Sequence, residues 1–208
     1  MLPHRQLIAL SLAAALFALG GCHQSVHDPK DYDVTAQYLG LDNHSVAVIV
    51  ATSDQLNYRQ PGAARQLARE ITRRIAINVP GVTVVDPDRL LAWQAENPYW
   101  SARTPGQLID ALNVDRLVMV EVGDYRMTDP GDTNIKRGVI SATINVVEAD
   151  ALDPDDFGFS EPLRVSFPDE FRTKVGLVEA SEQDIQTIIV SRFTEEAAGM
   201  FYDHTITR

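Results

Sequence analysis

The pattern of apolar and polar residues after position 45 predicts an α/β domain. Residues 46–51 are apolar and rich in β-branched side chains, which is typical of a buried strand. Residues 61–79 carry apolar side chains at helical spacing and end before a Pro-Gly pair. Residues 82–85 predict a second strand. Two strands joined through one helix lie parallel with a right-handed crossover, so this region predicts a β-α-β unit.

Two helices are expected before the third strand. An Asp-Pro pair at 86–87 supplies an N-cap and a first-turn proline to one helix, which Pro98 ends. A Thr-Pro pair at 104–105 gives the same start signal to the next helix. The apolar run at 117–122 predicts the third strand, which a second crossover would place in the same sheet.

The rest of the chain predicts two more strands and a final helix. Within residues 137–148, the apolar positions Ile140, Ala142, Ile144 and Val146 alternate with the polar positions Ser141, Thr143 and Asn145. This alternation predicts a strand with one covered face. Residues 163–167 predict a fifth strand, and Ser181 caps the last helix. The order β-α-β-α-α-β-β-β-α predicts a single α/β domain with a mixed sheet of about five strands, which ends in an antiparallel meander and has helices packed on it.

The first 21 residues have the anatomy of a secretory signal peptide. Arg5 and the amino terminus supply positive charge, and residues 7–19 are apolar except for Ser11. This run is too short to span a bilayer, which takes ~20 residues. Two glycines follow it and precede Cys22, the one cysteine of the chain.

Residues 19–22, Leu-Gly-Gly-Cys, match the lipobox of a bacterial lipoprotein signal at each position, and the segment resembles such a signal. The resemblance implies that residues 1–21 are removed and that Cys22 begins the mature chain, with diacylglycerol on its thiol and an acylated amine. Several acyl chains make such an anchor effectively permanent. His23 replaces the Asp of an inner-membrane retention signal, which favours the outer membrane and a periplasm-facing domain. An ordinary secretory signal with an incidental Cys22 is the alternative.

The segment between the signal and the domain predicts a tether. Residues 22–44 are polar and show no sustained periodicity, whereas the expected domain covers residues 45–205. A flexible chain of this length has a root-mean-square reach of ~25 Å. The domain would therefore search a shell above its membrane.

The acidic charge of the chain limits its partners. There are 18 Lys+Arg against 29 Asp+Glu, a formal net charge of −11, and loss of Arg5 with the signal leaves −12. Such a surface is repelled by phosphate backbones and anionic headgroups, so we expect no nucleic-acid binding and a membrane contact through lipid alone. A single cysteine excludes an internal disulfide framework, a cysteine-based zinc site and a dithiol redox centre.

Motifs of catalysis are missing from the sequence. The five histidines lie in the signal, in the tether or near the carboxyl terminus. The chain has no His-Glu-x-x-His, no phosphate-binding glycine loop ending in Lys-Ser/Thr and no Gly-x-Ser-x-Gly elbow. We therefore expect no catalytic residue, no cofactor and no metal. Four aspartates offer calcium ligands: Asp150, Asp153, Asp155 and Asp156. They lack the glycine and the distal glutamate of an EF-hand, which favours a solvated hairpin loop.

Two features mark a candidate partner surface. Arg65, Arg69 and Arg73 lie four residues apart on the first helix, away from its apolar stripe. They either receive an acidic partner or form a solvated helix face. Tyr99 and Trp100 lie in a loop between helices, where they either anchor a partner or cap the core of the domain.

Three short sequences at strand boundaries carry a family resemblance. They are Val-Ala-Val at 46–48, Val-Asp at 85–86 and Val-Asp-Arg-Leu-Val at 114–118. With the element order and the lipobox, they resemble the α/β domain of three bacterial groups over about residues 45–203. These groups are the curli-secretion lipoprotein, the lipoprotein activators of penicillin-binding proteins and the amino-terminal domain of the Tol–Pal propeller protein. Residues 126–136 are short and charged and hold no pore-forming insertion, so no secretion channel is implied.

Three functional hypotheses follow. The first is a lipid-anchored, non-enzymatic module that binds another envelope protein. The second is an auxiliary lipoprotein of an envelope transporter that binds a small or lipidic ligand. The third is a carboxylate-based hydrolase, which requires two acidic side chains that face each other in a cleft.

Overall fold

The computed structural model describes residues 31–129, 132–168 and 181–207 of the chain. These residues fall into two units. The larger unit covers 33–205, and the smaller one contains, among the described residues, 31–32 and 206–207. The expected signal peptide and Cys22 lie outside the described residues.

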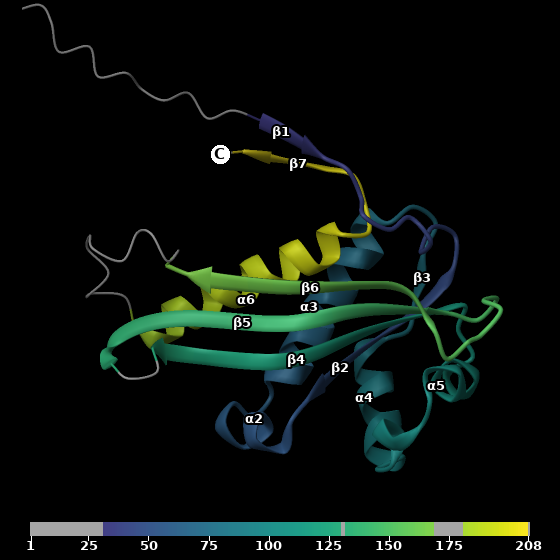
Figure 1. Ribbon diagram of the computed structural model, residues 1–208, viewed down its shortest axis with the longest axis horizontal. Coiled ribbons are helices and arrows are strands. Elements are labelled where there is room, and N and C mark those ends of the chain that lie inside the picture. The colour runs from purple at the N-terminus through teal and green to yellow at the C-terminus, as the bar shows by residue number, and fades with distance from the viewer. Residues whose placement is uncertain (1–30, 130–131, 169–180, 208) are drawn as a thin grey trace, which may run out of the picture. The chain divides into compact units, whose positions relative to one another are not determined.

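A five-stranded mixed sheet forms the centre of the larger unit (Figure 1). Its strands are β2 (Ser45–Thr52), β3 (Thr83–Val84), β4 (Arg116–Asp129), β5 (Asp132–Glu148) and β6 (Phe157–Phe167), in the order β3-β2-β4-β5-β6. β2 runs parallel to β3 and β4, and β4, β5 and β6 form an antiparallel meander. The predicted single α/β domain with a mixed sheet is confirmed.

Two long helices cover one face of this sheet. They are α3 (Ala63–Asn78) and α6 (Glu182–Gly199), which lie beside each other (Figure 1). Fully buried side chains form their inner faces: Leu67, Ile71 and Ile75 of α3, and Ile185, Ile189 and Phe193 of α6. Gly138 of β5 allows the close approach of α6, because a Cβ there would lie 3.0 Å from Cβ of Ile189. Burial of this apolar surface is the main force that holds the layers together.

The second face of the sheet is covered only in part. α4 (Pro87–Glu96) and α5 (Pro105–Leu112), separated by a 3₁₀ turn at Trp100–Ala102, pack over Ala47, Ile49, Leu117 and Val147. Asp86 caps α4, and Thr104 forms a capping box with Gln107 at the start of α5. This second core reaches Ile49 of β2 and Met119 of β4. Beyond these positions the same face carries the exposed residues Glu121 and Arg164 and the partly exposed residues Ser141 and Thr143.

Three elements were not expected from the sequence. α2 (Asp54–Arg59) follows β2 and buries only Leu56. β1 (Asp31–Val34) and β7 (His204–Thr207) form a two-stranded sheet.

The latter part of the expected tether packs on the domain. Leu41 is fully buried in the main core, and the backbone N–H groups of Gln37 and Tyr38 donate to the carbonyl of Met200. The compact unit begins at Asp33 rather than at residue 45. Within the described residues, no helix is both long and apolar enough to cross a membrane.

Candidate functional site

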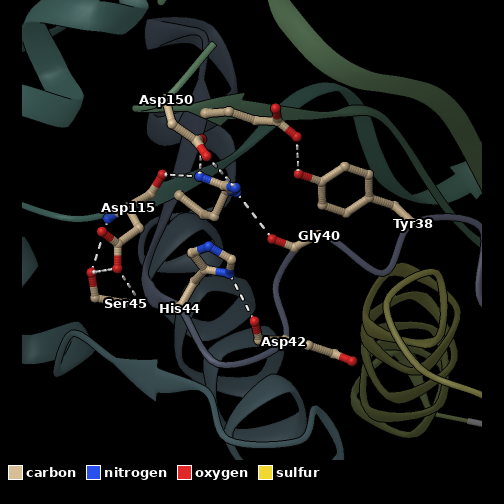
Figure 2. A network of polar contacts seen from close by, with 9 residues as sticks. Tyr38, Gly40, Asp42, His44, Ser45, Asp115 and Asp150 are labelled. Carbon is tan, nitrogen blue, oxygen red and sulfur yellow. Dashed lines mark hydrogen bonds and ion pairs between the residues drawn. The ribbon is translucent and has the colours of Figure 1, made fainter.

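A polar network joins the amino-terminal segment to the sheet, with Arg116 at its centre. Arg116 begins β4, and only 6 % of the residue is exposed. Its Nε donates to the carbonyl of Gly40 (3.0 Å), and its Nη1 donates to the carbonyl of Asp115 (2.9 Å) and to Oδ1 of Asp150 (2.6 Å). Figure 2 labels Gly40, Asp115 and Asp150, the three residues that accept these hydrogen bonds. One buried side chain thus binds residues from three parts of the chain.

Asp115 forms the second half of the network. The register of β2 and β4 sets Val46 beside Arg116, so Ser45 lies next to Asp115. The backbone N–H and the hydroxyl of Ser45 donate to Oδ2 of Asp115, at 2.8 and 2.6 Å. These hydrogen bonds lower the pKa of Asp115, and the hydrogen bond from Arg116 lowers the pKa of Asp150. Both carboxylates are therefore ionised at neutral pH and act as acceptors.

Tyr38 completes the network from the other side. Its hydroxyl donates to Oε1 of Glu148, and its ring packs against Phe159 and Phe201 with centroids 5.5 and 6.2 Å apart. Burial, followed by the hydrogen bond and the charge of Glu148, raises the pKa of Tyr38 far above its ordinary value. The tyrosine therefore stays neutral and keeps its hydrogen bond to Glu148. Together, the contacts of Tyr38, Gly40 and Ser45 form a structural clamp on residues 38–45.

The aspartate-rich loop takes part in hydrogen bonds within the protein. Besides Asp150, Asp155 accepts from the N–H of Gly106 at the start of α5 (2.8 Å), and Asp153 accepts from the N–H of Asp155 (2.9 Å). Among the described residues, no three His, Cys, Asp or Glu side chains are grouped as ligands of a metal ion. These contacts support the interpretation as a hairpin loop.

An open groove lies on the uncovered part of the second sheet face. Two adjoining cavities of about 470 and 440 Å³ share Glu121, Gly123 and Thr143. The first cavity also reaches Arg164 of β6, and the second reaches Ser53 after β2. Pairing sets Ala51, Glu121, Thr143 and Pro162 side by side in one row across four strands. The groove therefore crosses the sheet at the carboxyl end of β2 and the middle of β4.

Charged groups of opposite sign lie in and beside this groove. The exposed carboxylate of Glu121 makes no hydrogen bond or ion pair with a described residue. Arg164 has a half-exposed side chain, with its Nη1 4.0 Å from Oδ2 of Asp124. Asp124 is also bound by the closer guanidinium of Arg126. Arg164 thus shares its acidic neighbour with a second arginine.

The arginines of the predicted partner surface form local ion pairs on α3. Arg69 binds Asp88 of α4 through Nε (3.0 Å) and Nη2, and Arg73 binds Glu70 through Nη2 (2.8 Å). Arg65 is exposed. These pairs favour the solvated helix face, since surface ion pairs contribute little energy and need no partner.

The two aromatic residues of the predicted partner surface differ in their environment. Trp100 packs against the second core, so it serves the core of the domain. Tyr99 is 83 % exposed and stays a candidate contact. The structure therefore does not bring the five predicted residues together as one surface of free side chains.

The comparisons with known proteins give a likeness of fold only. No protein-family model and no curated protein matches the chain. PelC from Paraburkholderia phytofirmans, solved as a dodecamer, has a TM-score of 0.47 at 8 % identity and covers 83 % of this chain and 98 % of that one. Lipoprotein GNA1162 from Neisseria meningitidis has a TM-score of 0.44 at 13 % identity, with 74 % and 97 % covered. The hypothetical protein CT253 from Chlamydia trachomatis has a TM-score of 0.45 at 14 % identity, with 74 % and 93 % covered. These are distant likenesses.

The alternation in residues 137–148 predicts an open sheet face but not the groove on it. Ser141 and Thr143 belong to the polar side of the alternating strand and are partly exposed on the open face. Asn145 belongs to the same side but is buried, and its Oδ1 accepts from the hydroxyl of Ser160 (2.7 Å). The clamp had no such signal, because Arg116 stands in the sequence as one charged residue before an apolar strand. Its burial follows from the packing of Gly40 and Asp150 around it.

Proposed function

We propose that the chain is a lipid-anchored protein of the bacterial cell envelope that acts as a non-enzymatic interaction domain. The observation that carries this proposal is the Leu-Gly-Gly-Cys sequence at 19–22, directly after a short apolar run that follows Arg5. The proposed anchor is diacylglycerol with a further acyl chain such as palmitate on Cys22. The outer membrane is the proposed site, with the domain in the periplasm.

The α/β fold with its five-stranded mixed sheet fits the proposed resemblance to the three envelope groups named above. The anchor and the acidic charge act together in this proposal. With a mature net charge of −12, the domain gains nothing from an anionic membrane surface, so lipid holds it there while its surface stays free for protein contacts. Tyr99, exposed between α4 and α5, is a proposed contact for another envelope protein.

The described carboxylates favour a binding role over hydrolysis. A cavity of about 350 Å³ beside Ser45 is lined by two carboxylates, Asp110 and Asp115. Asp115 is held by Ser45 with a lowered pKa, so it is a poor general acid. Glu121 is the one carboxylate residue that lines the two cavities of the groove. One carboxylate of the cavity beside Ser45 is thus engaged as an acceptor and the groove has a single carboxylate, which favours binding over carboxylate-based hydrolysis at both places.

A second candidate function is the binding of a small ligand for an envelope transporter. The groove on the second sheet face favours it, because one of its cavities begins at the carboxyl end of the parallel strand β2, and open α/β sheets bind ligands beyond the carboxyl ends of such strands. An acyl chain would cover the charged groups of Glu121 and Arg164 and the hydroxyl groups between them without offering hydrogen bonds, which costs free energy. A polar ligand is therefore preferred over a lipidic one.

The anchor is tested by labelling cells with an alkyne-bearing fatty acid and determining the mass of the amino-terminal peptide. We expect label on the wild-type chain, an amino terminus at Cys22 and no label on Cys22→Ser. An unlabelled chain that is cleaved elsewhere would refute the anchoring.

A further inference from the structure

The groove on the uncovered part of the second sheet face is lined by one acidic residue, Glu121, and one basic residue, Arg164. Such a site suits a ligand that carries both a positive and a negative group. We propose that the groove binds a short peptide through its two charged ends, with the ammonium group at Glu121 and the carboxylate at Arg164. This proposal rests on the second candidate function and names the ligand class of that site. It is independent of lipid attachment at Cys22.

Glu121 supplies the anionic end of the site. It lies on the row shared by β2, β4 and β5, with Ala51 on one side and Thr143 on the other. Neither neighbour is cationic, and the carboxylate has no hydrogen bond or ion pair with a described residue. Both cavities include Glu121, so its charge is central to the groove. An ammonium group would gain a charge-assisted hydrogen bond there without breaking an existing one.

Arg164 supplies the cationic end. It pairs with Ser141, one row further along the sheet and two strands away from Glu121. Asp124 is shared with Arg126, so the positive charge of Arg164 is only partly balanced. Its guanidinium is half exposed and has the planar geometry that binds a carboxylate in a bidentate manner.

The spacing of the two ends fits a peptide of two or three residues. From the standard strand and residue spacings, the Cα atoms of Glu121 and Arg164 are about 12 Å apart. An extended dipeptide spans roughly 7 Å and an extended tripeptide roughly 10 Å, and a contact at each end adds about 3 Å. The dipeptide therefore matches the gap directly, and the tripeptide fits when the long side chain of Arg164 leans away from Glu121. The hydroxyl groups of Thr143 and Ser141 line the first cavity and are suited to the peptide groups of such a ligand.

Gly123 leaves the floor of the groove open. It is the extra residue of a β-bulge between Val122 and Asp124, and both cavities include it. A Cβ placed there would meet no atom within 4 Å. A large side chain at this position therefore fills the groove without a clash at its first atom, which makes Gly123→Leu a blocking variant.

The experiment is calorimetric titration of the full chain, purified from cells in detergent, with trialanine that has free termini. We expect binding of wild type, at least about tenfold weaker binding after acetylation or amidation of the peptide, and loss of binding in Gly123→Leu. Glu121→Gln should bind free and acetylated trialanine equally, and Arg164→Gln should bind free and amidated trialanine equally. Arg65→Gln on α3 is the matched control and should bind like wild type. Thermal melts establish that each variant is folded.

Two results would overturn this site. One is the absence of binding to wild type up to about 10 mM peptide, a concentration at which even a weak site is occupied. The other is binding that persists in folded Gly123→Leu or that is equal for free and doubly blocked peptides. Neither result affects fatty-acid labelling at Cys22, so failure of the site is distinguishable from failure of the anchor.

Discussion

The guanidinium of Arg116 lies 2.6 Å from the carboxylate of Asp150, yet the arginine side chain is 7 % exposed and the aspartate side chain is 70 % exposed. The arginine is therefore held by the interior, where it also binds the carbonyls of Gly40 and Asp115, while the aspartate faces solvent. Replacement of Arg116 therefore leaves the carbonyls of Gly40 and Asp115 without this donor, whereas replacement of Asp150 changes only a solvent-facing partner.

Replacement of Arg116 should release the segment before β2. Arg116→Gln removes the hydrogen bonds to Gly40 and Asp150, and we expect a loss of about 2 kcal/mol in the free energy of unfolding. Asp150→Asn should cost less, because its amide oxygen still accepts from the arginine. Urea denaturation measures both, and hydrogen exchange of residues 38–44 should accelerate in Arg116→Gln. Unchanged exchange in that segment would show that the clamp does not hold it.

A pair of leucines tests whether residues 38–44 belong to the folded unit. Leu41 is fully buried, whereas Leu39 is 58 % exposed. Leu41→Ala should lower the free energy of unfolding by about 3 kcal/mol through lost burial and the remaining cavity. Leu39→Ala should stay within about 0.5 kcal/mol of wild type, as exposed positions do. Equal effects in thermal or urea unfolding would contradict the observed packing.

Alkaline stability should depend on Tyr38. Its pKa is raised in the folded state, so the folded chain keeps the proton at a pH where the unfolded chain loses it. This contribution to stability is complete below the ordinary tyrosine pKa of about 10 and is lost as the pH rises above it. Tyr38→Phe should show a shallower decline of unfolding free energy between pH 9 and pH 11. The same slope in both proteins would mean that Tyr38 is not held neutral by burial and Glu148.

The long periodic elements could be predicted from the sequence, whereas features made by single residues could not. The apolar stripe of α3 and the alternation in β5 each repeat over several turns or pairs, so their period is clear. α2 is six residues long with Leu56 as its buried residue, which gives no period to detect. Leu41 is likewise one apolar residue in a polar stretch, and only its three-dimensional neighbours make it core.

The candidate site divides in the same way. The alternation in β5 predicted one covered face, and Ser141 and Thr143 lie on the open face, whereas Asn145 is buried. The meeting of Glu121 and Arg164 on one groove depends on the strand order, which brings β4, β5 and β6 together with a bulge at Gly123. The arginines at 65, 69 and 73 had a clear spacing, but the register of side chains on α4 supplied Asp88 as a partner for one of them.

Photo-cross-linking in intact cells tests the central claim of a lipid-anchored interaction domain most directly. A photoreactive phenylalanine derivative is placed at Tyr99, which is 83 % exposed, or at the matched position Tyr58, which is 89 % exposed. We predict one reproducible envelope protein cross-linked from position 99, its absence at position 58, and its loss when Cys22→Ser removes the anchor. A chain that cross-links to no protein from position 99, or to the same proteins from both positions, would contradict the account.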